Sequence, residues 1–112
     1  MKQSKIFHCT TGSGPARPVM VRFSKYDSND HLAVEVVDVA SPSVFKTITV
    51  NVQGKSDESR FAYVDTVNCP WAVKFLEENL IARHTRVWIA SGNCSYPLFE
   101  FNPDSIWEET SE

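Results

Sequence analysis

The residue best placed to do chemistry is a cysteine just before a predicted helix. Cys69 precedes Pro70 near the expected helix N-terminus, where the partial positive charge and free N–H groups favour a thiolate nucleophile. His84 follows the same helix and could serve as the base. The alternative is a small buried apolar residue beside Trp71, the commoner role of a cysteine in such surroundings. We expect Cys69 to be buried and unreactive.

The remaining thiols and imidazoles are too scattered to predict a metal centre. The cysteines are Cys9, Cys69 and Cys94, and the sequence has no Cys-x-x-Cys or His-x-x-x-His pair. We therefore predict no catalytic residue, no metal and no cofactor. Three cysteines are an odd, sparse set, unlike a secreted disulfide framework, which favours a cytoplasmic location. Cys9 should react first with a thiol reagent, because it lies in a segment expected to be irregular.

An aromatic and basic patch is the first candidate for binding a partner. Strand alternation places Trp88 on one face with Arg86, opposite Val87 and Ile89, and Tyr96 follows on the next strand. An aromatic ring beside an arginine supplies area and a planar donor fork at little cost in rotamer entropy. Trp88→Ala should then raise the off-rate of a partner and leave its salt dependence unchanged. The alternative is that the sheet is covered on both faces, or that these residues pack beneath the loop and the C-terminal tail.

The two ends of the chain carry opposite charge. Residues 1–26 hold five bases and no acid, whereas residues 100–112 hold five acids and no base. One interpretation is that these ends are solvated and meet across the fold. The other is a basic patch for nucleic acid, or an acidic surface that imitates it. For the acidic surface, neutralising Glu108, Glu109 and Glu112 should slow association and flatten its salt dependence. The residues that would serve a nucleic-acid-binding module are Arg22, Lys25, Tyr26, Arg86 and Trp88.

Length and composition predict one globular domain. The chain has 112 residues, of which 42% are hydrophobic and 22% charged, which suits a single folded core. No segment approaches the roughly 20 apolar residues needed to cross a bilayer. We divide the chain into an irregular N-terminal lead-in (1–18), a single α+β domain (19–101) and an acidic C-terminal tail (102–112).

Hydrophobic periodicity predicts the elements of that domain. Within 19–52, apolar residues recur at every second position of three segments, and short polar turns separate these segments. This pattern predicts an antiparallel meander. Asn68 is the expected N-cap of a helix over 70–81. Ala72, Phe75, Leu76 and Leu80 recur on its apolar side. The fold class is therefore α+β, with one antiparallel sheet of about five to six strands and one helix packed on one face. The predicted strands are 19–26, 32–36, 44–52, 61–64, 85–89 and 95–101.

Four segments together resemble a known family. Thr47–Val52, Phe61–Thr66, Asn68–Trp71 and Ser95–Phe101 are similar to segments of small proteins described only as a domain of unknown function, DUF4313-like. The resemblance covers roughly residues 19–101. It implies a gene carried by phages, plasmids or conjugative elements of gut and other Gram-positive bacteria, and it carries over no catalytic residue.

These observations leave three hypotheses. The first is a non-enzymatic accessory protein of a mobile genetic element that binds another protein, in its extreme form an inhibitor of a host defence of the CRISPR or restriction type. The second is a small nucleic-acid-binding module. The third is a cysteine-dependent enzyme that uses Cys69 and His84.

Overall fold

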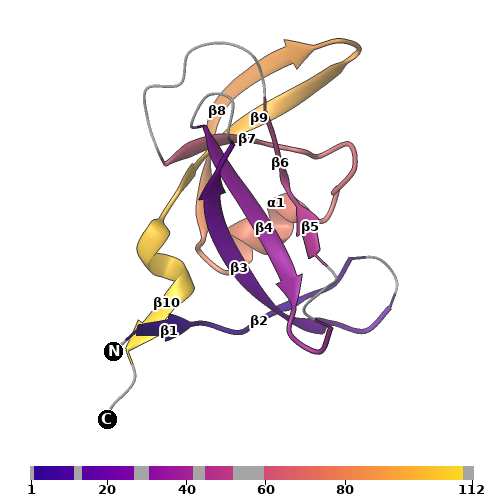
Figure 1. The fold of residues 1–112 in the computed structure, drawn as a ribbon. Helices are drawn as coiled ribbons and strands as arrows, with labels where there is room; N and C mark the ends of the chain where they lie inside the picture. The colour runs from indigo at the N-terminus through magenta and orange to yellow at the C-terminus, as the bar shows by residue number, and fades with distance from the viewer. Residues whose placement is uncertain (1, 12–13, 27–30, 42–44, 52–59, 110–112) are drawn as a thin grey trace.

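The computed structural model of the chain describes residues 2–11, 14–26, 31–41, 45–51 and 60–109, and Figure 1 shows their arrangement. Antiparallel strands dominate, and a short α-helix and a 3-10 helix complete the described part. The elements are β1 (Lys2–Ser4), β2 (Phe7–Cys9), β3 (Arg17–Lys25), β4 (Leu32–Asp38), β5 (Phe45–Thr47), β6 (Thr49–Val50), β7 (Phe61–Val64), α1 (Ala72–Glu78), β8 (Ala82–Ser91), β9 (Cys94–Phe101), η1 (Pro103–Ile106) and β10 (Trp107–Glu109).

Within the described residues the strands form three sheets. A first sheet has the order β2-β3-β4-β5, a second sheet has the order β6-β7-β9-β8, and β1 pairs with β10 in a terminal ribbon. The prediction of an α+β fold is confirmed. The prediction of one sheet with a helix on one face is wrong, because the meander and the C-terminal hairpin belong to different sheets (Figure 1).

The break between the sheets lies at Ile48. The predicted strand 44–52 divides there, since β5 pairs with β4 and β6 pairs with β7. The Ile48 N–H donates to the carbonyl of Val34 (2.9 Å), and the Ile48 carbonyl accepts the N–H of Asp65 (2.8 Å). One residue thus connects the two sheets while its own side chain is fully buried.

Both ends of the chain are more ordered than predicted. The lead-in 1–18 is not irregular throughout, because it contains β1 and β2, and β2 pairs with β3. The tail 102–112 contributes η1 and β10, and Figure 1 shows the terminal ribbon where they meet the N-terminus. Lys2 lies directly opposite Glu109 in this ribbon. The two termini of the chain thus lie side by side in this ribbon, as the first interpretation expects.

The helix is shorter than predicted and begins differently. Trp71 occupies the N-cap position of α1 without a side-chain cap. The expected cap Asn68 instead donates from its backbone N–H and its Nδ2 to the carboxylate of Asp65 (3.1 and 2.9 Å). Leu80, predicted on the buried side, follows the helix end and is 79% exposed. Among the described residues, no helix has the length and apolar character needed to cross a membrane.

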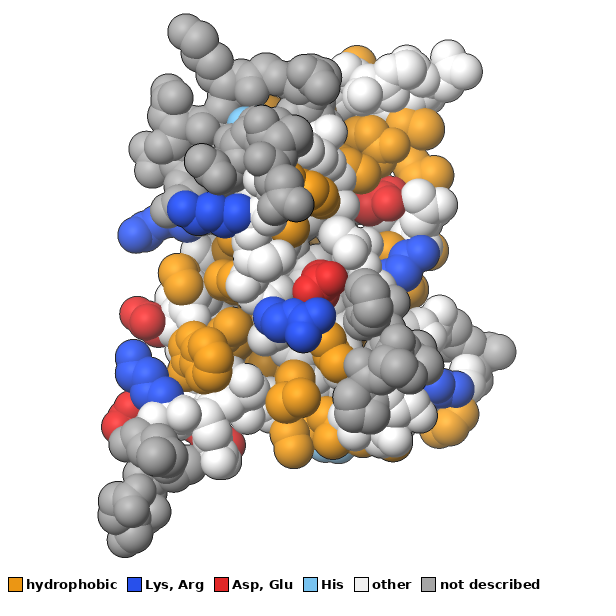
Figure 2. All heavy atoms as spheres, in the orientation of Figure 1, with side chains coloured by type: hydrophobic (Ala, Val, Ile, Leu, Met, Phe, Trp, Pro, Cys, Tyr) orange, Lys and Arg blue, Asp and Glu red, His pale blue; other side chains and the backbone are white. Residues whose placement is uncertain are grey.

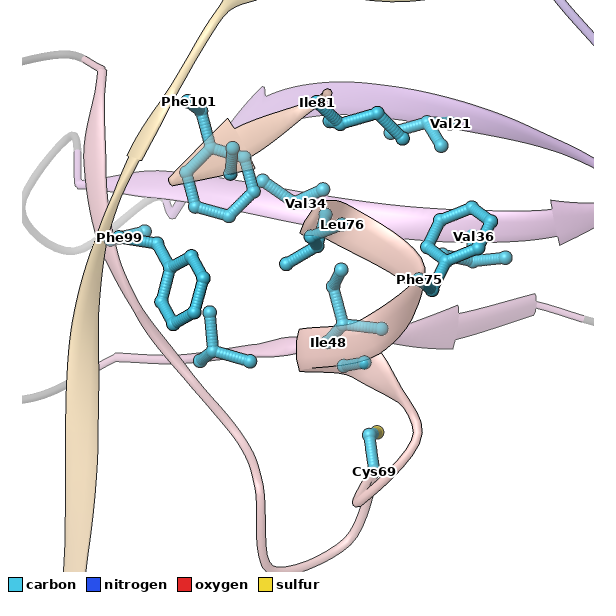
Figure 3. Packing of buried hydrophobic residues seen from close by; sticks show 14 of the residues in the cluster. Val21, Val34, Val36, Ile48, Cys69, Phe75, Leu76, Ile81, Phe99 and Phe101 are labelled. Carbon is cyan, nitrogen blue, oxygen red and sulfur yellow. The ribbon is translucent and has the colours of Figure 1, made fainter. Parts of the chain in front are cut away.

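The hydrophobic core lies between the two four-stranded sheets and α1 (Figure 3). Edge-to-face aromatic pairs connect the layers. Phe23 of β3 meets Phe101 of β9 with ring centroids 5.8 Å apart, and Phe7 of β2 meets Phe75 of α1 at 6.0 Å. The fully buried large side chains come from both sheets, from α1 and from the connections between them. Among them are Val21, Val34, Ile48, Val64, Leu76, Ile81 and Phe99.

Candidate functional site

The longest hairpin projects from the body of the protein. Strands β8 and β9 pair along their length, and their outer half extends past the core to a turn at Gly92, whose φ is +62° (Figure 1). Gly tolerates this left-handed conformation without a steric penalty. In Figure 2 exposed hydrophobic side chains lie on this part of the surface, at the upper right. The hairpin therefore presents side chains that the core does not need.

Strand β8 contains a bulge halfway along this hairpin. His84 lies opposite Phe99, but the next aligned pair is Trp88 with Pro97. Thr85–Val87 therefore oppose a single residue of β9. A bulge of this kind bends its strand, increases the local twist and changes the direction of the side chains that follow.

Hydrogen bonds fix the bulge in one conformation. Thr85 Oγ1 donates to the carbonyl of Leu98 (2.8 Å) and accepts the N–H of Val87 (3.2 Å). His84 Nδ1 accepts the N–H of Arg86 at 2.7 Å. Arg86 has a φ of +73°, a left-handed conformation that non-glycine residues rarely adopt. The side chains of His84 and Thr85, which both precede Arg86, thus hold the backbone in this conformation.

Trp88, which follows the bulge, is exposed to solvent, and the ring of His84 supports its indole. Trp88 is 56% exposed and its neighbour Val87 is 49% exposed. The Trp88 ring contacts His84 at a centroid distance of 5.5 Å, and His84 contacts the buried Phe99 at 5.0 Å. The predicted anchor is thus neither beneath a loop nor buried under the tail.

The other two members of the predicted patch are placed differently. Tyr96 lies opposite Ile89, whereas Trp88 lies opposite Pro97. Since successive residues of a strand point to opposite faces, Trp88 and Tyr96 lie on opposite faces of the hairpin. The alternation that placed Arg86 with Trp88 does not continue through the bulge. The structure therefore does not bring the three residues together in one patch.

Tyr96 belongs to a partly buried environment. Burial raises the pKa of its hydroxyl, and a hydrogen bond with the Cys94 side chain raises it further. Cys94 and Tyr96 are two residues apart on β9 and share a face. Tyr96 is therefore partly buried and interacts with Cys94 of its own strand.

The Cys69 thiol is enclosed. Its side chain is fully buried, and its Sγ donates a weak hydrogen bond to the carbonyl of Thr47 (3.9 Å). Burial raises the pKa of Cys69, although the positive charge of Lys46 lowers it in part. His84, the predicted base, is engaged with the aromatic rings of the hairpin. These features disfavour a thiolate nucleophile.

The prediction that Cys9 is the accessible cysteine is wrong. Cys9 is 2% exposed because β2 is a paired strand that turns its side chain into the core. Burial, together with the negative charge of an ionised Cys69, raises the pKa of Cys9 to about 11. Cys94 is half-exposed and is the most accessible of the three thiols.

Two of the five candidate nucleic-acid contacts are engaged within the protein. Arg22 pairs with Glu35 at 2.8 Å, and the Tyr26 hydroxyl donates to a backbone carbonyl of β6 at 3.1 Å. Lys25 and Arg86 are exposed. Arg22 and Tyr26 are thus engaged within the protein, whereas Lys25 and Arg86 are open to solvent.

Two acidic residues of the C-terminal end lie in the terminal ribbon. Glu108 accepts a hydrogen bond from Gln3 Nε2 at 3.1 Å, and Glu109 lies directly opposite Lys2. Glu112 lies outside the described residues. The two described acids thus face a neighbouring strand with polar and basic side chains, unlike the isolated acidic surface that one interpretation required.

A second cluster was not predicted. Arg60 and Arg83 both pair with Glu100, at the base of the hairpin, and line a hollow of about 520 Å³. These residues come from three segments that are far apart in the sequence, so no local spacing signals their meeting. The bulge has no sequence signal either, because β-branched residues occupy every second position of 85–89, as in a regular strand.

Comparison with known proteins gives a family but no activity. Within the described residues, no group of three or more His, Cys, Asp or Glu side chains gathers as metal ligands would. No curated protein and no solved structure matches the chain. The sequence model of the family described as "Domain of unknown function (DUF4313)" matches residues 20–111. Since this match spans most of the sequence, the chain belongs to the DUF4313 family.

Proposed function

We propose that this protein is a non-enzymatic accessory protein that binds another protein through the outer half of the β8–β9 hairpin. The observation that carries the proposal is Trp88, a large aromatic side chain that is 56% exposed at a bulge fixed by hydrogen bonds. Tryptophan is enriched among the residues that dominate binding energy, because it offers a large contact area with few rotatable bonds.

The surroundings of Trp88 favour a protein partner. His84 supports the ring from the core side, and Val87, the residue before Trp88, is also exposed. An interface centre of this kind is apolar and preorganised, which reduces the entropy lost on binding. Arg86 is exposed at the same bulge, where a charged group would affect orientation more than affinity.

The two alternatives have less support. A nucleic-acid-binding module needs unpaired basic side chains along a face, and Arg22 is already paired with Glu35. A cysteine-dependent enzyme needs an accessible thiolate, and burial raises the pKa of Cys69. Both alternatives remain outcomes of the experiments below.

The biological setting belongs to the same proposal. The family resemblance implies a mobile genetic element, and the free thiols of Cys9, Cys69 and Cys94 suit a reducing cytoplasm. We propose that the partner belongs to the host, and that inhibition of a defence of the CRISPR or restriction type is the specific form of the function.

Photo-crosslinking tests the binding surface directly. Benzoylphenylalanine is placed at position 88, and in a matched control at position 107, where Trp107 is 41% exposed on the terminal ribbon. In host cells, the probe at position 88 should crosslink a defined protein that the probe at position 107 does not. Excess unlabelled protein should suppress the crosslink, and excess Trp88→Ala protein should not.

The identified partner is then purified, and its binding to the intact chain is measured in solution. A partner that binds the Trp88→Ala variant as tightly as the natural protein would contradict the proposed surface. The defence form of the proposal is tested by plating a targeted phage on cells that express the protein. Plating should rise with the natural protein and the Trp107→Ala variant, and should stay low with Trp88→Ala.

A further inference from the structure

We infer that the hollow at the base of the β8–β9 hairpin is a second binding site, which takes an acidic segment of a partner protein with a carboxylate beside an apolar side chain. The hollow lies at the opposite end of the hairpin from its turn and does not include Trp88. Its occupation and the proposed contact at Trp88 can therefore fail separately.

Two strands of the second sheet and the residue before a third build the charged wall of the hollow. Glu100 lies on β9, between Phe61 of β7 and Arg83 of β8 in the pairing register. Arg60 immediately precedes β7 and places its Nη1 4.0 Å from Glu100 Oε2, while Arg83 binds Oε1 of the same carboxylate. The volume of about 520 Å³ is within the range of natural ligand sites.

This wall carries excess positive charge. One carboxylate lies between two guanidinium groups, and no other carboxylate of the described residues pairs with either of them. The side chain of Glu100 is 21% exposed, whereas those of Arg60 and Arg83 are 57% and 78% exposed. Each guanidinium has five N–H donors in a planar fork, and both side chains are more than half exposed, so donors remain for a further carboxylate.

The apolar wall contains a leucine in a costly position. Leu80 is the first residue beyond the C-cap of α1, with a φ of +56°. Its N–H bonds to the carbonyl of Glu77, and the N–H of Ile81 bonds to the carbonyl of Leu76. This is the hydrogen-bond pattern of a Schellman motif, in which glycine is preferred at the left-handed position.

No burial of the Leu80 side chain offsets the cost of that backbone conformation. It is 79% exposed, while Ile81 after it is fully buried and completes the apolar contact of the motif. A left-handed leucine that contacts solvent costs conformational energy without burying apolar surface. Its position on the rim of the hollow, beside Arg60 and Arg83, supplies the reason: Leu80 covers the apolar part of a bound segment.

The two walls together select the ligand. The guanidinium groups require an anion, and a carboxylate matches their planar fork. Leu80 requires an apolar group next to that anion, which a phosphate group of nucleic acid lacks. An acidic peptide segment with leucine-like neighbours satisfies both requirements, and inorganic phosphate satisfies one.

Nuclear magnetic resonance of the full-length, ¹⁵N-labelled protein tests this assignment. The probe is the peptide acetyl-Glu-Leu-Glu-Leu-amide, and its control carries Gln at both Glu positions. Inorganic phosphate and a thymidine oligonucleotide are titrated separately. The acidic peptide should shift the backbone amides of Arg60 and of residues 80–83 in a saturable manner, and the Gln peptide should not.

Four variants should change the affinity for the acidic peptide in different ways. Arg83→Gln should weaken peptide binding by about tenfold, since it removes a charge-assisted contact. Glu100→Gln should strengthen binding, because it removes the internal carboxylate that competes for the same donors. Leu80→Gly should weaken binding without lowering Tm, which separates loss of a contact from loss of the fold. Arg22→Gln, whose partner Glu35 lies on the first sheet, should change nothing.

The outcomes are decisive in both directions. Equal shifts with the Glu and Gln peptides, or weaker binding to Glu100→Gln, would overturn the carboxylate site. Shifts at these amides with phosphate or the oligonucleotide alone would assign the hollow to phosphate groups and contradict the proposal. Trp88→Ala should bind the peptide normally, and a loss there would show that the two surfaces are not independent.

Discussion

The imidazole of His84 supports the indole of Trp88, with ring centroids 5.5 Å apart and an interplanar angle of 54°. The same imidazole contacts the buried Phe99 and accepts the N–H of Arg86 through Nδ1. An exposed aromatic side chain is thereby connected to the core through one residue. This arrangement gives Trp88 a fixed position on a projecting hairpin, as a binding anchor requires.

Trp88→Ala should weaken partner binding without unfolding the protein. Removal of an exposed aromatic anchor should raise the off-rate by about tenfold or more, and leave the salt dependence of association unchanged. The free energy of unfolding should change by less than about 1 kcal/mol, because more than half of the side chain is already exposed. Surface plasmon resonance and urea titration measure the two quantities, with Trp107→Ala as the matched control.

Neutralising Glu108 and Glu109 together distinguishes the hairpin from the acidic end. These acids face Gln3 and Lys2 across the terminal ribbon, and exposed pairs of this kind contribute little. Glu108→Gln with Glu109→Gln should change the free energy of unfolding by less than about 1 kcal/mol. The partner's association rate and its salt slope should not change. Slower association with a flatter slope would instead place the binding surface at the acidic end.

Leu80→Gly should stabilise the free protein. Glycine adopts the observed φ of +56° without the steric cost that leucine pays, although it gains more entropy when unfolded. We expect a net increase of about 0.5–1 kcal/mol in the free energy of unfolding, from the urea midpoint. Leu80→Ala is the control, since it shortens the exposed side chain and keeps the strained backbone. A gain in both variants would attribute the effect to side-chain exposure instead.

Cys94 should react first with a thiol reagent in the native protein. It is half-exposed at the start of β9, whereas Cys9 and Cys69 are 2% and 0% exposed. Reaction with Ellman's reagent should show one fast thiol, and two that appear at the rate of unfolding. Cys94→Ser should remove the fast phase alone. A fast phase that persists in this variant and disappears in Cys69→Ser would restore the cysteine-enzyme hypothesis.

Stability should fall as pH rises above the ordinary thiol range. The pKa of Cys9 is raised from 9.0 to about 11, so between these values the folded protein binds a proton that the unfolded chain has released. The contribution of this thiol is thus complete below pH 9 and is lost as pH approaches 11. Urea unfolding of the natural protein and Cys9→Ala at pH 7, 9 and about 10.5 tests this. The natural protein should show the steeper decline, and parallel declines would refute it.

Several elements were predictable because their signals are local. The alternation in 19–26 and 32–36 predicts β3 and β4, and that in 61–64 gives β7. A strand-turn-strand pattern around Gly92 predicts the hairpin, since Gly and Asn favour the left-handed turn positions. The helix was also predictable, although its ends moved: Asn68 has Asp65 as a nearer partner, and the chain turns left-handed at Leu80.

The pairing of strands was not predictable in the same way. Residues 45–50 read as one continuous strand, and their division at Ile48 depends on two different neighbours, Val34 and Asp65, which are distant in sequence. Likewise, β1 finds β10 only when the ends of the chain come together. A period-two pattern states which side chains share a face, but it carries no information about which strand lies alongside.

The sequence alone therefore determined the α+β class, the hairpin and the family, because periodicity, turn residues and motif order are properties of neighbouring positions. Tertiary structure decided that Trp88 is supported by His84 and separated from Tyr96, and that Arg60, Arg83 and Glu100 meet around one hollow. These relationships depend on a two-residue shift in strand register and on contacts between distant segments. The cross-strand partner, which local residue type does not specify, sets both of them.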